Sequence, residues 1–322
     1  MTAQKVLVTG ATGFVGEALV FRLLLGKRFV PVAATRSVTR CQGLCSVTNF
    51  NLSGPLLLPE LHGASVVVHT AARVHVMKES ASDALAEYRK ANVAGTLELA
   101  RHAAKSGVKR FIFLSTIKVN GEATVKGRPF KADDVPSPID PYAISKFEAE
   151  EGLKKLAAET DMEVVIIRPP LIYGPGVKAN FLSMLQWLAR GVPLPFGSIY
   201  NQRSLVSIEN LLDLIITCID HPAAANQTFL VSDGADLSTT QLLKCLAGAL
   251  GVKARLVAIP EWLILLAGTM LRKQSVASRI CSSLQVDIAK NREILNWTPV
   301  MNVGTSLRRT AEFFMINHVK AL

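Results

Sequence analysis

The sequence predicts an α/β fold, in which a doubly wound parallel sheet is followed by a smaller, mostly helical C-terminal part. Three observations favour it. Short runs of Val, Leu, Ile and Phe alternate with segments of helical periodicity through the first half of the chain. The first run leads directly into three glycines spaced three apart, Gly10, Gly13 and Gly16. Beyond Gly174, segments of helical periodicity dominate.

The predicted sheet is built from short apolar runs. The all-apolar run Val66–Val68 is typical of a strand that is covered on both faces. The predicted strands are Val6–Val8, Phe29–Ala34, Val47–Leu52, Ser65–Thr70, Arg110–Ser115 and Glu163–Arg168. The helices predicted between them are Ala18–Leu25, Asp83–Ser106 and Tyr142–Thr160. In such a sheet the ligand binds at the carboxyl ends of the strands, where Gly10, Ala71 and Thr116 fall.

The pattern after Gly174 predicts a second, smaller unit. Its helices are predicted at Asn180–Arg190, Leu211–Ile219, Thr239–Leu250, Glu261–Arg272 and Thr305–Asn317, and its extended pieces at Leu205–Ser207 and Thr228–Val231. We therefore expect one domain over residues 1–173 and another over 174–322. Within the second, about 203–235 is expected to return to the core of the first.

The segment Lys5–Gly16 predicts a dinucleotide site of the Rossmann type. A glycine-rich turn between a strand and a helix lets backbone N–H groups approach a pyrophosphate, and the helix dipole favours its negative charge. Glycines also serve ordinary turns, so a purely structural turn is the alternative. The strand before the glycines and the helix after them favour the dinucleotide site.

The end of the second predicted strand bears on the choice of cofactor. An acidic residue about 20 positions past the glycines typically binds the ribose hydroxyls of NAD. Here the sequence has Thr35, Arg36 and Ser37 instead. Arg36 could bind a 2′-phosphate with help from Ser37, which favours NADP over NAD, or it could stack on adenine or face water.

Composition narrows the class of protein. Hydrophobic residues make up 49% of the 322, which argues against disorder, and the net charge of +11 suits either a solvated basic face or an anionic substrate such as a nucleotide diphosphate. The dispersed Lys and Arg residues argue against nucleic acid. Five scattered cysteines and the lack of a His cluster predict reduced thiols and no metal site. With no signal peptide recognisable, we expect a cytoplasmic protein.

The most apolar later stretch is Trp262–Leu271, which is too short to span a bilayer. We expect it to be a buried helix. A membrane anchor is the alternative, because the basic pair Arg272 and Lys273 follows directly.

Tyr142 and Lys146 are the candidates for chemistry. Four residues apart on a predicted helix, they lie on one face, and a neighbouring ammonium would lower the pKa of the phenol. The tyrosine could then exchange a proton near neutral pH. Thr116, at the end of the preceding strand, could polarise the same oxygen, and a bound nicotinamide would exchange the hydride. A surface Tyr–Lys pair is the alternative reading.

With these motifs, the chain resembles the extended short-chain dehydrogenases/reductases of the nucleotide-sugar epimerase/dehydratase type. The motifs that carry the resemblance are T-G-A-T-G-F-V-G, H-T-A-A, N-V-A-G-T, L-S-T-I-K-V-N-G, Y-A-I-S-K and R-P-P-L-I-Y-G-P-G. The resemblance implies that Thr116, Tyr142 and Lys146 are catalytic. It further implies that Lys146 holds the nicotinamide ribose, that Asn92 supports this lysine through water, and that the chain forms a homodimer.

The site residues expected on this basis fall into two sets. Those for the cofactor are Gly10, Thr12, Gly13, Phe14, Val15, Gly16, Arg36, Ser37, Ala71, Ala72, Asn92, Tyr142, Lys146 and Pro169. Those for a UDP-sugar are Arg73, Thr116, Asn180, Phe196 and Arg203. Surface or turn roles remain the alternative for the substrate residues.

Departures from the family pattern affect the expected reaction. Asn51 replaces an Asp that usually meets adenine, and Asn120 replaces the usual Tyr of V-Y-G. Ile117 and Lys118 stand where 4,6-dehydratases of the family carry an Asp-Glu pair, so a dehydratase is disfavoured.

Three functions remain open. Arg36 and a similarity of the C-terminal half to bacterial 4-keto reductases favour reduction of a UDP-4-keto-6-deoxy-N-acetylhexosamine for O-antigen synthesis. The alternative is a UDP-glucose or UDP-N-acetylglucosamine 4-epimerase with bound NAD. A non-catalytic NADP sensor is disfavoured, because Tyr142 and Lys146 are both present.

Overall fold

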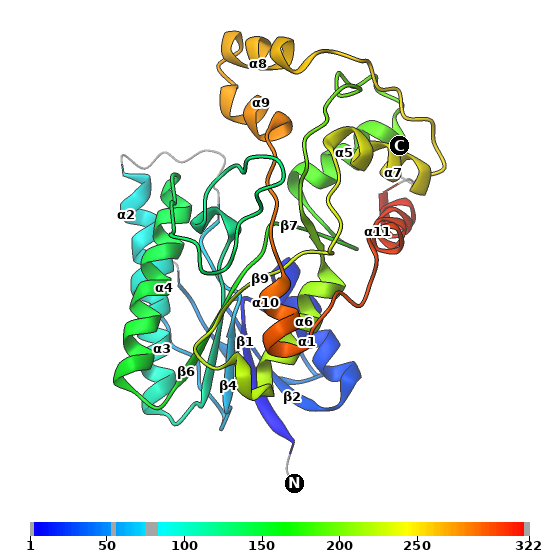
Figure 1. The fold of residues 1–322 in the computed structure, drawn as a ribbon. Coiled ribbons are helices and arrows are strands. Elements are labelled where there is room, and N and C mark those ends of the chain that lie inside the picture. The colour runs from blue at the N-terminus through cyan, green and yellow to red at the C-terminus, as the bar shows by residue number, and fades with distance from the viewer. Residues whose placement is uncertain (1–2, 53–55, 75–82, 319–322) are drawn as a thin grey trace.

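A parallel sheet organises the first part of the chain. The computed structural model describes residues 3–52, 56–74 and 83–318. They form a seven-stranded sheet in the order β3-β2-β1-β4-β5-β6-β9, with every neighbouring pair parallel (Figure 1). The strands are β1 (Gln4–Thr9), β2 (Phe29–Thr35), β3 (Ser46–Asn49), β4 (Val66–His69), β5 (Arg110–Leu114), β6 (Glu163–Arg168) and β9 (Thr228–Leu230). The strand order reverses between β1 and β4, which is where such sheets bind ligands.

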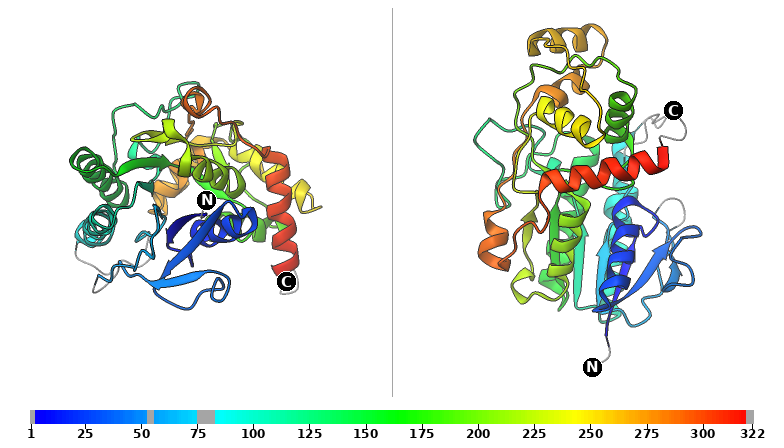
Figure 2. Two further views of the ribbon diagram at one scale, coloured as in Figure 1. Left: turned by 90° about the horizontal axis from the view of Figure 1, so that it is seen from below. Right: turned by 90° about the vertical axis from the view of Figure 1, so that its right-hand side faces the viewer.

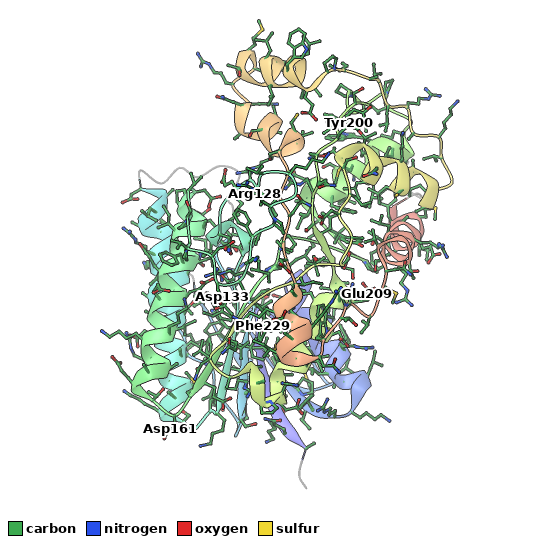
Figure 3. All side chains as sticks on the ribbon, viewed as in Figure 1. Arg128, Asp133, Asp161, Tyr200, Glu209 and Phe229 are labelled. Carbon is green, nitrogen blue, oxygen red and sulfur yellow. The ribbon has the colours of Figure 1, made fainter. Side chains whose placement is uncertain are left out.

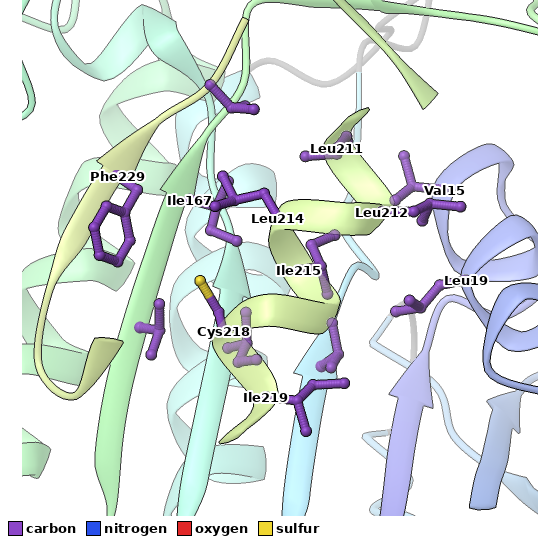
Figure 4. Packing of buried hydrophobic residues seen from close by; sticks show 14 of the residues in the cluster. Val15, Leu19, Ile167, Leu211, Leu212, Leu214, Ile215, Cys218, Ile219 and Phe229 are labelled. Carbon is purple, nitrogen blue, oxygen red and sulfur yellow. The ribbon is translucent and has the colours of Figure 1, made fainter. Parts of the chain in front are cut away.

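Alternate side chains of the strands pack against helices on opposite faces. One face is covered by α1 (Phe14–Gly26) and α6 (Ile208–Asp220), which contact each other over the sheet (Figure 4). The other face is covered by α3 (Thr96–Lys105) and α4 (Pro141–Glu159). Because both faces are buried, the strands read as continuous apolar runs.

A smaller unit lies beyond the carboxyl ends of the strands. Its core joins α5 (Ala179–Ala189), α7 (Thr239–Ala249) and α11 (Val303–His318) to the two-stranded parallel sheet of β7 (Leu171–Tyr173) and β8 (Leu205–Ser207). Helix α11 lies between α1 and α7 in Figures 1 and 2. Helices α8 (Glu261–Met270) and α9 (Gln274–Cys281) form a hairpin at the far end, and α10 (Ala289–Leu295) returns to the sheet beside β9.

The doubly wound sheet and its helical appendage confirm the predicted fold class. Most predicted elements are present with ends shifted by one to four residues, whereas β7 and α9 are additions. Helix α6 begins at Ile208, three residues earlier than predicted, because the Ser207 hydroxyl accepts a hydrogen bond from the Asn210 amide. The domain boundary at 173/174 stays a prediction, although β9 lies in the main sheet.

The segment Asp83–Ser106 forms one continuous helix, as predicted, in which a π-helical stretch over Arg89–Gly95 joins α2 (Ala84–Tyr88) to α3. Another helix prediction is wrong. The helix at Trp262–Leu271 is not buried. Within α8, Gly268 is the buried residue, since the hairpin projects from the molecule and packs mainly on itself.

A buried ion pair ties α4 to the sheet. Glu150 of α4 and Arg168 at the end of β6 are both almost fully buried, and their side chains are joined by several hydrogen bonds. The Ser115 hydroxyl also donates to Glu150. Arg168 Nη1 donates to Asn120 Oδ1 over 3.0 Å, so the Asn found in place of the family's usual tyrosine belongs to this network.

We expect Glu150→Gln to lower the free energy of unfolding by about 3–5 kcal/mol, because it leaves the buried Arg168 guanidinium without its countercharge. Urea denaturation followed by circular dichroism measures this. The control is Glu148→Gln, two residues away on α4, which removes the partly exposed pair with Arg89 and should cost about 1 kcal/mol or less. Equal losses from the two variants would contradict a structural role for the buried pair.

Candidate functional site

A cavity of about 660 Å³ runs along the carboxyl ends of the strands. Its wall comes from the segments that follow β1, β2, β3, β4, β5 and β6, together with the first turn of α4. The expected site residues in this wall are Gly10, Thr12, Gly13, Phe14, Val15, Gly16, Arg36, Ala71, Ala72, Thr116, Tyr142 and Pro169. Most of the expected cofactor residues therefore share one cavity with two of the three expected catalytic residues.

The glycine turn is so closely packed that side chains at two of its positions would collide with the neighbouring backbone. Gly10 has φ +68°, and a Cβ there would lie 2.8 Å from the amide nitrogen of Ala71. A Cβ on Gly16 would lie 2.3 Å from the carbonyl oxygen of Gly10. Gly13 caps α1, which begins at Phe14 and directs its N-terminal amides at the cavity. The turn fits a pyrophosphate at a helix N-terminus.

A buried histidine fixes the two central strands below this turn. His69 Nδ1 lies 2.7 Å from the Thr9 hydroxyl, and Nε2 lies 3.0 Å from the Thr96 hydroxyl. Burial, with the charge of Lys146 as a smaller cause, lowers the pKa of His69 to about 3. The ring is therefore neutral, so it serves as a hydrogen-bonding bridge rather than as a charged ligand.

An ion pair joins the loop of Thr116 to the helix of Tyr142. Asp140 caps α4 by accepting a hydrogen bond of 2.7 Å from the Ala143 amide, and its carboxylate also pairs with Lys118. Lys118 is two residues after Thr116, and Asp140 is two residues before Tyr142. The lysine that replaces a carboxylate of the dehydratases thus helps to hold the two hydroxyl-bearing residues at the same cavity.

The expectation that Lys146 lowers the pKa of Tyr142 is wrong for this structure. The pKa of Tyr142 is raised, mainly by burial and further by the charge of Asp140 and by Tyr88. Lys146 is itself buried, with Nζ 3.9 Å from the centroid of the Phe113 ring, and does not line the cavity. Burial lowers the pKa of Lys146 to about 7 even though Glu150 acts in the opposite direction.

Asn92 is buried and holds the segment after Ala72. Its side chain accepts a hydrogen bond from the Arg73 amide over 2.8 Å, and it donates to the Arg73 carbonyl and to the Ser145 hydroxyl. Asn92 lies in the π-helical stretch, a geometry that is frequent at functional sites. It therefore fixes the segment after Ala72 against α4, and its support of Lys146 through water stays a prediction.

Several expected residues lie outside the cavity wall, namely Ser37, Arg73, Asn92, Lys146, Asn180, Phe196 and Arg203. Asn180 is exposed in the first turn of α5, and the Phe196 carbonyl accepts a bond from Thr240. Arg203 Nη1 donates to the carbonyls of Arg279 and Ser282. The substrate-binding roles of Asn180, Phe196 and Arg203 stay predictions.

The cavity wall also contains residues that the sequence reasoning did not assign to it: Ala34, Thr35, Phe50, Leu52, Thr70, Val74, Leu114, Ser115, Pro170, Leu171 and Ile172. Asn51, which replaces the Asp that usually meets adenine in the family, lines the cavity as well. Many of these residues lie at or directly after the end of a predicted parallel strand, and this position could have placed them in the cavity wall. Leu171 and Ile172 could not be found in this way, because they belong to β7, a strand that was not predicted.

Within residues 3–52, 56–74 and 83–318, no group of three or more His, Cys, Asp or Glu side chains is arranged to bind a metal ion. The helices in those same ranges include none with the length and hydropathy needed to cross a membrane.

Comparisons with known proteins agree with this geometry. The profile of the NAD dependent epimerase/dehydratase family matches residues 6–232. A UDP-glucose 4-epimerase of Vibrio cholerae is 49% identical over 97% of this chain and 96% of its own length. One from Mycolicibacterium smegmatis is 29% identical over 97% of this chain and 98% of its own.

A solved structure has the same fold. The UDP-glucose 4-epimerase of Thermotoga maritima, determined with UDP-glucose, superposes with a TM-score of 0.76 over 97% of this chain and 99% of its own, at 23% sequence identity.

We expect Gly16→Ala to weaken dinucleotide binding and to destabilise the fold by about 1–3 kcal/mol, because the added methyl group would collide with the Gly10 carbonyl. Calorimetric titration with NAD and urea denaturation measure the two effects. Gly248→Ala in α7 is the control: its methyl group meets nothing within 4 Å, and the change should stabilise the protein by about 0.5–1 kcal/mol. Unchanged NAD binding in Gly16→Ala would contradict the assignment of the glycine turn as the binding site of the pyrophosphate.

Proposed function

The chain belongs to the NAD dependent epimerase/dehydratase family, and from that premise we propose that it is a UDP-sugar 4-epimerase. One observation carries the proposal: the glycine turn, Thr116 and Tyr142 line a single cavity. The likeness to the Vibrio cholerae UDP-glucose 4-epimerase, which spans nearly the whole of both chains, supports the same reaction. Epimerisation was the alternative in the sequence analysis, and these relatives favour it over the reductase.

The residues in the wall fit acid–base chemistry at a sugar hydroxyl. The Tyr142 phenolate would take the proton of the C4 hydroxyl during oxidation, and the resulting phenol would return it during reduction. The Thr116 hydroxyl would hydrogen-bond the same oxygen and orient it. When bound, NAD supplies the hydride acceptor and donor for C4. Burial raises the pKa of Tyr142, so the phenol has to lose its own proton before it can accept the proton of the C4 hydroxyl.

The reductase remains the second candidate because Arg36 lies in the cavity wall with its side chain exposed. A guanidinium there can bind a 2′-phosphate, which would favour NADP. A UDP-4-keto-6-deoxy-N-acetylhexosamine would then be reduced once, by the same Thr116 and Tyr142. Consumption of NADPH distinguishes this reaction from epimerisation, which returns the cofactor unchanged.

The purified protein should convert UDP-glucose to UDP-galactose without consuming added cofactor. Tyr142→Phe should lower kcat by about 10²–10⁴-fold, because it removes the proton-transferring oxygen. Nucleotide-sugar chromatography measures the conversion, and Tyr200→Phe, which alters an exposed tyrosine outside the wall, should leave kcat unchanged. Stoichiometric NADPH oxidation that occurs only with a 4-keto UDP-sugar would overturn the epimerase in favour of the reductase.

Arg36→Ala tests cofactor preference. If Arg36 binds the 2′-phosphate, its loss should weaken NADP binding by about 10–100-fold and leave NAD binding unchanged, since a hydrogen bond to a charged group contributes about 1.5–3 kcal/mol. Calorimetric titration with each dinucleotide measures this. Arg40→Ala is the control, because Arg40 pairs with Glu17 nearby. Equal weakening of both dinucleotides by Arg36→Ala would mean that Arg36 contacts their shared adenosine.

A further inference from the structure

The hairpin of α8 and α9 is the outermost feature of the C-terminal unit. It lies at the end of the molecule opposite the N-terminus, beyond α5 and α7 (Figures 1 and 2). Its two helices are held together by a close approach, since a Cβ on Gly268 would lie 2.5 Å from the Cβ of Ala277. Below it, the Tyr200 amide donates to the Glu261 carboxylate over 3.3 Å (Figure 3). A flat surface could therefore reach the hairpin without meeting the sheet.

Helix α8 is apolar around its circumference, yet it is exposed. Trp262 is 63% exposed, Leu266 51% and Met270 78%. Further exposed apolar side chains of the hairpin are Leu263, Leu265, Leu271 and Val276. A helix of this kind is normally covered by other groups, and an apolar patch that is exposed marks an interaction site.

The charged residues of the hairpin favour an anionic surface as the partner that covers α8. Arg272 and Lys273 follow α8 directly, Arg279 lies on α9, and all three are exposed. The single acid between residues 261 and 281 is Glu261, at the start of α8. An apolar helix with a tryptophan at its first turn and basic residues at its end suits the interface of an anionic bilayer, where the tryptophan and the cations lie at the headgroups.

The dimensions indicate how the helix would lie. Ten residues extend about 15 Å, half the hydrocarbon thickness, so α8 cannot cross a bilayer. A protein partner would cover one side of α8 and leave apolar groups exposed on the other. Acyl chains can cover the apolar groups of α8 that α9 leaves exposed.

We propose that the α8–α9 hairpin docks this protein on an anionic lipid bilayer, with α8 lying in the plane of the interface. The leucines of α8 enter the acyl boundary and Trp262 lies at the headgroup level, while Arg272, Lys273 and Arg279 contact lipid phosphates. The dinucleotide cavity lies at the sheet, away from the hairpin, so docking and catalysis are separate properties of the chain.

Flotation of the full chain with phosphatidylethanolamine–phosphatidylglycerol vesicles tests the proposal. The protein should float with these vesicles, and less with pure phosphatidylcholine or at high salt. Arg272→Gln combined with Lys273→Gln should weaken partitioning about 30-fold, since each basic side chain at such a surface contributes about 1 kcal/mol. Trp262→Gln combined with Leu266→Gln should weaken it about tenfold or more, through loss of apolar burial.

Matched controls are Lys154→Gln with Lys155→Gln on α4, and Leu25→Gln on α1, which change exposed residues far from the hairpin. They should float like the parent protein. Circular dichroism and UDP-sugar turnover should be unchanged in the hairpin variants. Absence of flotation by the parent chain overturns the proposal, as does a soluble oligomer that dissociates when Trp262 and Leu266 are replaced, since a second copy would then cover α8.

Discussion

Glu150 and Arg168 form a buried ion pair on which the geometry of the whole site depends. Tyr142, Lys146 and Glu150 are spaced four residues apart on α4, so they share one face of that helix. Glu150 binds Arg168 at the end of β6 and Ser115 at the end of β5. The helix that carries the phenol is thereby held to β5 and β6, two of the strands whose ends form the cavity wall.

The buried charged groups below the cavity lower the stability of the fold. Two cations, Lys146 and Arg168, are buried there beside one carboxylate, Glu150, and His69 is neutral. Removing an ion from water is unfavourable unless partners replace the solvent. Arg168 has such partners in Glu150 and Asn120, but Lys146 has mainly the face of the Phe113 ring. A buried cation with a lowered pKa is typical of functional sites.

The sequence predicted the parts of the site that depend on local patterns. Apolar runs predicted most strands, and position after a strand end predicted that Gly10, Ala71 and Thr116 would meet. Features that depend on tertiary packing could not be predicted in this way. The burial of Lys146, the bonds from Asn92 to Arg73 and Ser145, and the exposure of α8 all depend on which segments face each other. An apolar run predicted burial at α8 only because hydropathy alone does not show whether anything covers a helix.

Tyr142 and Thr116 are proposed to act together on one sugar oxygen beside the dinucleotide. A crystal structure of the protein with NAD and UDP-glucose tests this most directly. We predict that the C4 oxygen lies within hydrogen-bonding distance, about 2.6–3.2 Å, of the Tyr142 phenol and close to the Thr116 hydroxyl. A UDP-sugar bound with its C4 oxygen beyond the reach of Tyr142 would contradict the claim.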